Sequence, residues 1–212
     1  MKYTALIVAA GSGTRLGLGY NKAYYRLDDR TILEHSMRLF LEDPDCEEIV
    51  VVTDGETYYR ETGPETEGRI VIAEGGSTRQ ESVWNGLQAV ISDTVLIHDG
   101  ARPYLSSECL ERLKTAMETE DAACLAVPCK DTIKLSGDGY FTETLPREKL
   151  MSAQTPQAFR TELILNAMNQ AMKDGFLGTD DCSVAEKYTD VRIRAVEGSY
   201  ANIKITTVED LK

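Results

Sequence analysis

The chain of 212 residues carries 23 Lys and Arg against 35 Asp and Glu, a formal net charge of −12, and 42% of its residues are hydrophobic. This length suits one large domain with a substantial core. An acidic protein does not bind nucleic acid through its general field, and no apolar run approaches the ~20 residues that cross a bilayer. We therefore expect no nucleic-acid or membrane partner.

The five cysteines and two histidines suggest neither a disulfide framework nor a zinc site. The number of cysteines is odd, and the sequence has no C-x-x-C pair. This usage is typical of reduced thiols that pack inside a cytoplasmic protein.

The first predicted element is a strand over residues 4–9, which ends in the loop Gly11-Ser12-Gly13-Thr14. A short apolar run that ends in glycines fits a first strand better than a signal peptide. Glycines let the backbone approach a ligand closely, and the amides of such a loop bind anions. Arg15 and Lys22 follow, so we predict a site for a triphosphate. The alternative is a tight turn without a ligand, followed by two solvated cations.

The spacing of this loop disfavours the common nucleotide fingerprints. The pattern G-x-G-x-x-G requires glycine at position 16, where the chain has Leu16, and Gly17 comes one residue late. The ribose-binding acid of that pattern lies ~20 residues on, whereas the nearest candidate here, Asp54, is much farther along. The lysine spacing of a P-loop is also missing. A nucleoside triphosphate loop of another kind remains.

Helices and strands alternate in the following segments. Thr31 and Glu34 form a capping-box pattern that begins a helix, and its apolar face has helical spacing. Further strands are predicted at residues 48–53, 69–73, 94–98 and 122–127. Between them we predict a helix from Thr78 to Ile91 and another capped by Ser106 or Ser107.

A hairpin then interrupts the alternation. Two short alternating runs, residues 133–135 and 140–142, flank the turn Ser136-Gly137-Asp138-Gly139. Beyond it we predict a helix to about residue 173, a short helix from Thr179, and strands at residues 191–196 and 202–204.

This order predicts an α/β fold with a mostly parallel central sheet, helices on both faces and a protruding β-hairpin arm. Neither a long linker nor an internal repeat divides the chain, so we expect residues 1–212 to form one domain. Open sheets of this class bind ligands beyond the carboxyl ends of their strands. Three polar segments are predicted to fall there.

The second of these segments is Gly75-Gly76-Ser77-Thr78-Arg79, with Ser82 one turn into the following helix. Paired glycines suggest close approach to a flat base. A plain helix N-cap at Ser77 or Thr78 is the alternative.

The third segment, His98-Asp99, suggests a hydrolase at first sight, but the nucleophile elbow G-x-S-x-G is missing. Asp99 at a strand end is instead a suitable hard-oxygen ligand for Mg²⁺, which takes few protein carboxylates and leaves the rest to phosphates and water.

Later segments are less specific when taken alone. Asp131-Thr132-Ile133-Lys134 and Arg147 flank the hairpin and are compatible with a polar edge strand. Thr179-Asp180 is a good helix start, although Asp180-Asp181 also resembles a pair of functional acids. Lys204 lies on the last predicted strand.

Together, seven segments in this order resemble the family of 2-C-methyl-D-erythritol 4-phosphate cytidylyltransferases, which act in non-mevalonate isoprenoid biosynthesis. They are Ala9-Ala10-Gly11-Ser12-Gly13-Thr14-Arg15-Leu16-Gly17, Gly75-Gly76 with Arg79 and Ser82, His98-Asp99-Gly100-Ala101-Arg102-Pro103, Asp131-Thr132-Ile133-Lys134, Gln154-Thr155-Pro156-Gln157-Ala158-Phe159, Thr179-Asp180-Asp181 and Asn202-Ile203-Lys204-Ile205-Thr206. Each segment is modest alone, but the match runs nearly end to end.

The resemblance implies a Rossmann-like nucleotidyltransferase fold and a homodimer whose β-arm, at about residues 132–145, reaches the neighbouring subunit. It implies that CTP and Mg²⁺ are used, and that CDP-methylerythritol and pyrophosphate are formed. It also assigns roles. The catalytic cations would be Arg15, Lys22, Arg147 and Lys204. The substrate and nucleotide site would comprise Ala9, Ala10, Gly11, Ser12, Gly13, Gly76, Ser77, Arg79, Ser82, Asp99, Ala101, Arg102, Thr132, Thr155 and Thr179, with Asp99 at the metal.

The inventory of side chains agrees with this chemistry. The nucleophile would be a phosphate monoester, which is mostly dianionic at neutral pH because its second pKa is about 6. No general base is required. The difficulty lies in bringing two anions together, which calls for cations and a metal.

Two departures and two alternatives accompany the resemblance. The family usually has Pro-Lys-Gln where this chain has Asn21-Lys22-Ala23, and often an acid at the position of Ser77. The related ribitol-5-phosphate cytidylyltransferases tend to have Ala-Gly-Gly and Asp-Ala-Val-Arg-Pro; the segments Ala9-Ala10-Gly11 and 99–103 favour methylerythritol phosphate. A non-catalytic nucleotide-binding module is the second alternative, which the retained Arg15, Lys22, Asp99 and Lys204 disfavour.

Overall fold

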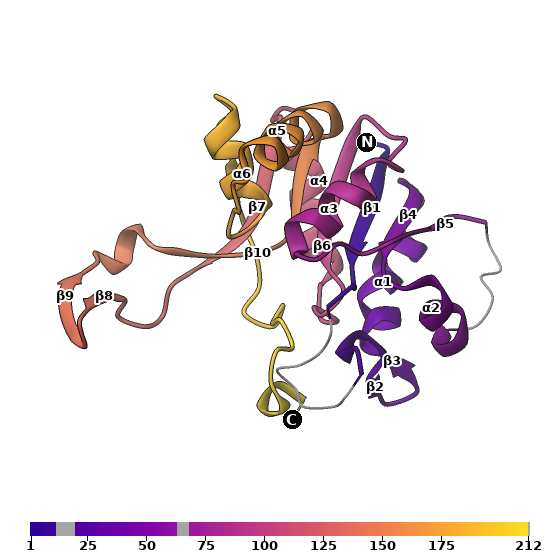
Figure 1. Cartoon of the computed structure of the whole chain (residues 1–212), viewed down its shortest axis with the longest axis horizontal. Helices are drawn as coiled ribbons and strands as arrows, with labels where there is room; N and C mark the ends of the chain where they lie inside the picture. The colour runs from indigo at the N-terminus through magenta and orange to yellow at the C-terminus, as the bar shows by residue number, and fades with distance from the viewer. Residues whose placement is uncertain (12–19, 63–67, 212) are drawn as a thin grey trace.

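The apolar run that opens the chain forms β1 (Tyr3–Val8), which lies inside the central sheet. The computed structural model describes residues 1–11, 20–62 and 68–211. In this part of the chain the main sheet has seven strands in the order β11-β7-β10-β6-β1-β4-β5 (Figure 1). The others are β4 (Cys46–Val52), β5 (Ile70–Ala73), β6 (Thr94–Asp99), β7 (Ala122–Pro128), β10 (Met151–Arg160) and β11 (Arg194–Glu197).

Most neighbouring strands in this sheet are parallel, as the alternating pattern predicts. β1 pairs in parallel with β4 and β6, β4 with β5, and β7 with β11. β10 is antiparallel to both β6 and β7 and was not predicted as a strand. Its ladder shifts register between Ala153 and Gln157, where Pro156 has no amide hydrogen to donate.

Two helical layers cover the sheet. One face carries α1 (Ile32–Glu42), α2 (Gly55–Thr62) and α4 (Ser107–Ala116), and the other carries α3 (Arg79–Leu87), α5 (Thr161–Asp174) and α6 (Asp181–Tyr188). Strand alternation divides the core accordingly: Ala5 and Ile7 pack with Phe40 of α1, whereas Leu6 packs with Val83 of α3.

The local signals at helix starts are confirmed. The Thr31 hydroxyl accepts the Glu34 amide at 3.1 Å, and the Glu34 carboxylate accepts the Thr31 amide at 2.7 Å. Thr78 and Ser106 cap α3 and α4. The cap of α6 is Asp180, one residue beyond the predicted start.

Two predictions about elements are wrong, and one helix was not predicted. Helix α3 ends at Leu87 rather than at Ile91, whose side chain is 71% exposed. The α2 helix was not predicted, because it is largely polar and the residue that it buries in the core is Tyr58. Residues 202–204 do not form a strand; side-chain hydrogen bonds hold them instead.

The hairpin projects from the body as β8 (Lys134–Gly137) and β9 (Tyr140–Thr144) (Figure 1). Its two-residue turn is Asp138-Gly139, with φ values of 51° and 82°, the left-handed conformation that matches strand twist. Tyr140 and Phe141 are 78% and 75% exposed. A 3-10 turn, η3 (Arg147–Lys149), leads from the hairpin back to β10.

The remaining short elements lie near the two ends of the chain. They are η2 (Lys22–Tyr24), β2 (Arg26–Leu27), β3 (Arg30–Thr31) and η4 (Val208–Leu211). No helix in the described ranges is both long and apolar enough to span a bilayer. All five cysteines are free thiols, as the sequence predicts.

Candidate active site

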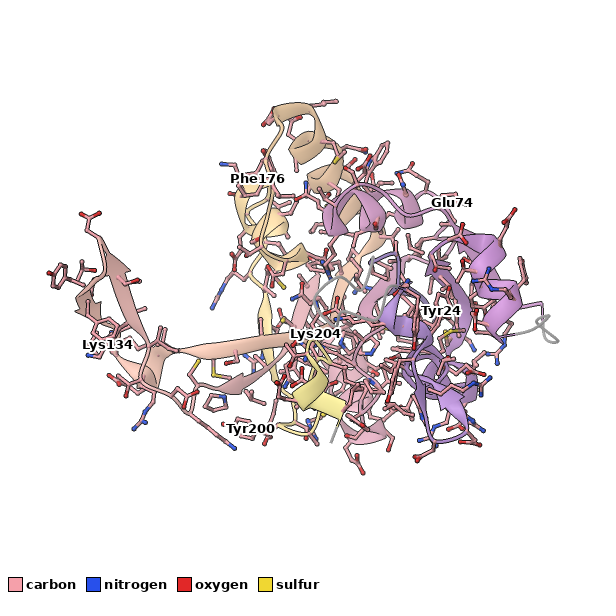
Figure 2. The ribbon with its side chains drawn as sticks, turned by 60° about the horizontal axis from the view of Figure 1, so that its bottom comes forward. Tyr24, Glu74, Lys134, Phe176, Tyr200 and Lys204 are labelled. Carbon is pink, nitrogen blue, oxygen red and sulfur yellow. The ribbon has the colours of Figure 1, made fainter. Side chains whose placement is uncertain are left out.

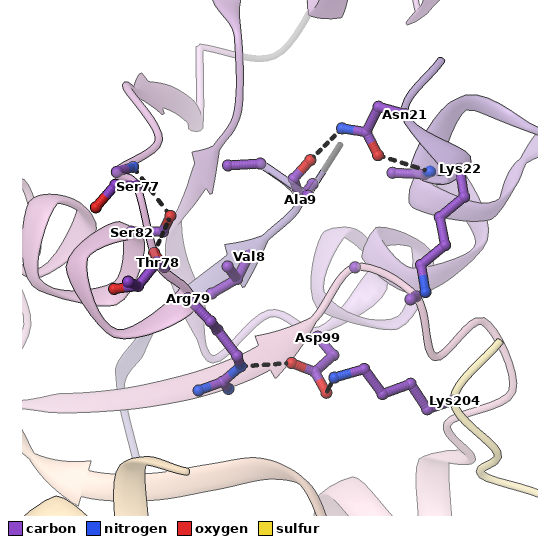
Figure 3. Close-up of a pocket in the computed structure, with 16 residues that line it drawn as sticks. Val8, Ala9, Asn21, Lys22, Ser77, Thr78, Arg79, Ser82, Asp99 and Lys204 are labelled. Carbon is purple, nitrogen blue, oxygen red and sulfur yellow. Dashed lines mark hydrogen bonds and ion pairs between the residues drawn. The ribbon is translucent and has the colours of Figure 1, made fainter. Parts of the chain in front are cut away.

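A cleft lies at the carboxyl ends of β1 and β6, where the sheet changes its direction of winding. The chain runs outward from β1 to β4 and β5, then crosses to β6 on the other side of β1. Open α/β sheets bind ligands at such a switch point. The cleft, whose lining residues are drawn in Figure 3, has a volume of about 400 Å³. It is lined by Val8, Ala9, Ala10, Gly11, Asn21, Lys22, Ala23, Gly76, Ser77, Thr78, Arg79, Ser82, Asp99, Gly100, Ala101 and Lys204.

The first wall follows β1 and is joined to η2 by one side chain. Asn21 donates its amide hydrogen to the Ala9 carbonyl, and its Oδ1 accepts the Ala23 amide at 3.0 Å. The amide at position 21 thus ties the Lys22 turn to the end of β1. The predicted site residues Ser12, Gly13 and Arg15 lie outside the described residues.

The second wall is the turn between β5 and α3. A side chain at Gly75 would overlap the Cβ of Ala10, so glycine is required for the two walls to approach each other. The Ser82 hydroxyl accepts the Gly76 amide at 3.0 Å and donates to the Thr78 carbonyl at 2.9 Å. Ser77 donates its amide to Glu81 at 2.7 Å. Thr78 is the N-cap of α3, one of the two residues predicted for that role. The predicted site residues of this segment also line the cleft: Gly76, Ser77, Arg79 and Ser82.

A buried carboxylate, Asp99, lies at the floor of the cleft among three cations. Its Oδ1 is 3.0 Å from Arg79 Nε, and its Oδ2 is 2.9 Å from Lys204 Nζ and 3.6 Å from Arg102 Nε. The Asp99 side chain is 8% exposed. Burial alone would raise the pKa of Asp99, but the charges of Arg79, Lys204 and Arg102 outweigh it and hold that pKa well below its usual range. Asp99 is therefore an anion at neutral pH.

Arg79 is held by a second carboxylate that was not among the predicted site residues. Its Nη1 and Nη2 each lie 2.9 Å from one oxygen of Asp181, at the start of α6. Burial would lower the pKa of Arg79, but Asp181 and Asp99 raise it above its ordinary value. The sequence marked Asp181 only as one of two adjacent acids. Its partner is distant in sequence, so no local pattern could reveal the pair.

Lys22 and Lys204 reach the cleft from opposite ends of the chain. Lys22 Nζ donates to the Ile205 carbonyl at 2.6 Å, and the Ile205 amide donates to the Ala101 carbonyl at 2.8 Å. The segment that carries Lys204 therefore lies between the Lys22 turn and the loop after β6. This brings together two of the four predicted catalytic cations.

Thr155 and His98 lie behind the cleft. The Thr155 hydroxyl accepts the Asp99 amide at 3.0 Å and lies 3.1 Å from His98 Nδ1, while His98 Nε2 lies 3.2 Å from the Arg102 carbonyl. Complete burial lowers the pKa of His98 to about 4. The neutral ring therefore donates through Nε2 and accepts the Thr155 proton at Nδ1. In this arrangement His98 serves as a structural link, in line with the missing hydrolase motif.

Other predicted residues lie around or away from this cleft. Arg102 contacts Asp99 but does not line the cleft, and it donates to the Asn202 carbonyl at 2.7 Å. Thr179 lines a smaller neighbouring cavity of about 180 Å³ that shares Thr78 and Arg79 with the cleft. Thr132 and Arg147 are exposed at the arm, and Figure 2 shows Lys134 of that arm well away from Lys204.

Comparison with known proteins identifies the family. Residues 3–212 match the family model for IspD, 2-C-methyl-D-erythritol 4-phosphate cytidylyltransferase. The curated proteins of that name from Shouchella clausii and Geotalea uraniireducens are 43% and 45% identical, each over 100% of this chain and 94% of its own length.

Solved structures agree. The 4-diphosphocytidyl-2C-methyl-D-erythritol synthase from Anaerococcus prevotii has a TM-score of 0.87 at 33% identity, covering 99% of this chain and 95% of its own. The 2-C-methyl-D-erythritol 4-phosphate cytidylyltransferase from Francisella tularensis has a TM-score of 0.86 at 30% identity, covering 100% of this chain and 97% of its own. The chain therefore belongs to the 2-C-methyl-D-erythritol 4-phosphate cytidylyltransferase family.

Proposed function

We infer that this protein transfers CMP from CTP to 2-C-methyl-D-erythritol 4-phosphate, giving CDP-methylerythritol and pyrophosphate in non-mevalonate isoprenoid biosynthesis. Family membership over the whole chain supports the reaction. The observation that carries it at the site is the grouping of Lys22, Arg79 and Lys204 around one cleft in a protein of net charge −12. Against that overall charge, such a grouping favours a polyanionic ligand.

The two walls of the cleft support a placement for CTP. The base would lie against the turn at Gly76 and Ser77, which lines the cleft. The ribose would lie near Asp99 and Ala101, and the triphosphate along the loop from Ala9. Arg15 and Lys22 would then meet the α-phosphate and stabilise the charge that develops on it during transfer.

The acceptor needs no general base. Its phosphate monoester is mostly dianionic at pH 7, because its second pKa is about 6. One of its oxygens attacks the α-phosphorus of CTP, the bond from that phosphorus to the bridging oxygen breaks, and pyrophosphate leaves with the electron pair. Lys204 supplies a cation for the incoming phosphate. His98 is not in contact with the cleft and does not take part as a base.

Asp99 fits the role of a Mg²⁺ ligand. The described residues contain no cluster of three or more His, Cys, Asp or Glu side chains that could hold a metal, so a metal here would rely on this one carboxylate and on substrate phosphates. A carboxylate has about four lone-pair positions, and Asp99 uses some of them for Arg79 and Lys204. When bound, Mg²⁺ would neutralise the phosphates. Lys204, beside Asp99, would hold the acceptor phosphate.

We propose further that the protein is a homodimer in which the arm completes the site of the neighbouring subunit. Thr132 and Arg147 lie at the two ends of the arm and are exposed in one chain, while Tyr140 and Phe141 at its tip present apolar surface. Apolar side chains gathered on a projecting hairpin favour burial against a partner. Residues 1–212 would then act as one domain with an exchanged arm.

The substrate is tested by following pyrophosphate release with CTP, Mg²⁺ and either methylerythritol phosphate or ribitol-5-phosphate. We expect release with methylerythritol phosphate. Release with ribitol-5-phosphate alone would favour the related enzyme, and release with neither would favour a nucleotide-binding module without activity.

A further inference from the structure

The loop that carries Lys204 is irregular, yet it delivers the ammonium group to a defined place. Residues 198–203 follow β11 and contain neither helix nor strand. Lys204 Nζ nevertheless lies 2.9 Å from Asp99. A mobile loop would lose this position, so other contacts must hold its backbone.

One set of contacts comes from β10. Gln154 donates its side-chain amide to the Ser199 carbonyl at 2.8 Å and accepts the Ser199 amide at 3.3 Å, as a neighbouring strand would. Asn202 Nδ2 donates to the Thr155 carbonyl at 2.9 Å and to Gln154 Oε1 at 3.4 Å. Both acceptors face the nitrogen of Asn202, so the opposite orientation of its amide would bring oxygen against oxygen.

A second set comes from the loop after β6. Arg102 donates to the Asn202 carbonyl at 2.7 Å, and Ala101 accepts the Ile205 amide at 2.8 Å. Asn202 is fully buried and is held through both its side chain and its backbone. It is two residues from Lys204, whose other flank is held by the buried Ile205.

The outer edge of the loop is fastened to the root of the arm. Tyr200 donates its hydroxyl to the Pro128 carbonyl at 2.7 Å, and Lys130 Nζ lies 3.6 Å from the centre of the Tyr200 ring. Tyr200 is 46% exposed, so this fastening can be removed without opening the core.

We propose that Asn202 is a positioning residue for the transfer reaction: its buried amide fixes the loop so that Lys204 stands beside Asp99 and faces the acceptor phosphate. This assignment rests on the proposed function for its kinetic consequence, but the placement of Lys204 can be measured without turnover. Asn202 touches neither substrate nor metal in this account and acts through Lys204.

The placement is tested by the acylation rate of Lys204 in Asn202→Ala. A limiting dose of an acetyl N-hydroxysuccinimide ester labels free amines, and mass spectrometry compares Lys204 with the exposed Lys173 in the same sample. Pairing with Asp99 shields Lys204 in the parent protein. We expect its labelling to rise about fivefold in the variant, the change that losing one net hydrogen bond gives a local opening equilibrium.

The matched control is Asn169→Ala, which removes a hydrogen bond of the same length, 2.9 Å from Trp84 Nε1, away from the cleft. It should leave Lys204 labelling unchanged. If Asn202→Ala fails to fold, as judged by circular dichroism and cooperative urea unfolding, Tyr200→Ala loosens the same loop from its exposed side and should raise Lys204 labelling in the same direction.

Turnover gives the second measurement. In Asn202→Ala we expect kcat to fall about tenfold while KM for CTP stays within about twofold, because Lys204 serves the acceptor rather than the nucleotide. Unchanged Lys204 labelling in folded Asn202→Ala, or in Tyr200→Ala where the first variant does not fold, would overturn the proposal. Raised labelling in a protein whose parent form has no turnover would retain the positioning role and reject the proposed function.

Discussion

At the scale of single residues, charged side chains surround Asp99 in the cleft. Those that lie in short local motifs could be predicted from the sequence, whereas those paired with distant residues could not. Arg79 and Asp99 could be predicted because each lies in a short recognisable segment that contains glycine, at or just beyond the end of a strand. Asp181 could not be assigned, because its ion pair with Arg79 joins α6 to α3 across more than a hundred residues. Asn21, the departure from the family pattern, proves to tie Ala9 to the Lys22 turn.

The role that we propose for Lys22 gives the first prediction. Lys22→Ala should lower kcat by about 10² to 10³, since removing one group that stabilises developing charge has effects of that size. The dissociation constant of CTP, measured by calorimetry, should change much less. Lys173→Ala on the exposed face of α5 is the control. A kcat equal to that of the parent protein would remove Lys22 from the mechanism.

At the scale of elements, patterns complete within a few residues were predictable and those completed by tertiary contacts were not. The Thr31 capping box lies within four residues and is confirmed. β10 was not predicted as a strand, because Pro156 and its polar neighbours interrupt any alternating pattern. Its strand conformation is stabilised by backbone pairing with β6 and β7. The 202–204 segment alternates like a strand but is held by Arg102 and Thr155.

The approach of the two cleft walls gives a prediction for Gly75. In Gly75→Ala the new methyl group would overlap Ala10, so the turn against which we propose that the base lies must shift. We expect KM for CTP to rise at least about tenfold, given how steeply misplacement weakens a site. Gly137→Ala is the control, since its methyl group would lie an ordinary 3.8 Å from Thr142. An unchanged KM in Gly75→Ala would mean that this turn does not contact the nucleotide.

A buried ion pair at the opposite end of the sheet predicts how stability depends on pH. Lys114 of α4 lies 2.9 Å from Asp43, which also accepts the Tyr3 hydroxyl at 2.8 Å. Burial would raise the pKa of Asp43, but hydrogen bonds from Lys114, Asp45 and Tyr3 lower it. Burial would lower the pKa of Lys114, but its carboxylate partners raise it.

The sign follows from these directions. Asp43 contributes its full stability at pH values above its unfolded pKa of about 4, and this contribution is lost as the pH falls through its lower folded pKa. Lys114 contributes its full stability at pH values below its unfolded pKa of about 10, and this contribution is lost as the pH rises through its higher folded pKa. Lys114→Met should therefore lower the free energy of unfolding by about 3 kcal/mol at pH 7. In urea titrations this deficit should shrink below about pH 4 as Asp43 becomes neutral. A deficit that stays constant from pH 3 to 8 would contradict the role of this pair.

At the scale of the whole molecule, the arm is the feature whose function the structure of a single chain does not explain. The sequence predicts the hairpin itself from two short alternating runs about a glycine turn, because such a pattern is local. Its function depends on another molecule and rests on our dimer proposal. Phe141→Asp at the tip should halve the mass measured by light scattering, whereas Tyr59→Asp, an exposed tyrosine on α2, should not. A parent protein with the mass of one chain would reject the exchanged arm.

The transfer reaction itself is tested most directly with methylerythritol phosphate that carries ¹⁸O in its three terminal phosphate oxygens. If an oxygen of the acceptor attacks the α-phosphorus of CTP, mass spectrometry will find the full label in CDP-methylerythritol and none in pyrophosphate. Label in pyrophosphate, or CTP consumption without labelled CDP-methylerythritol, would contradict the account.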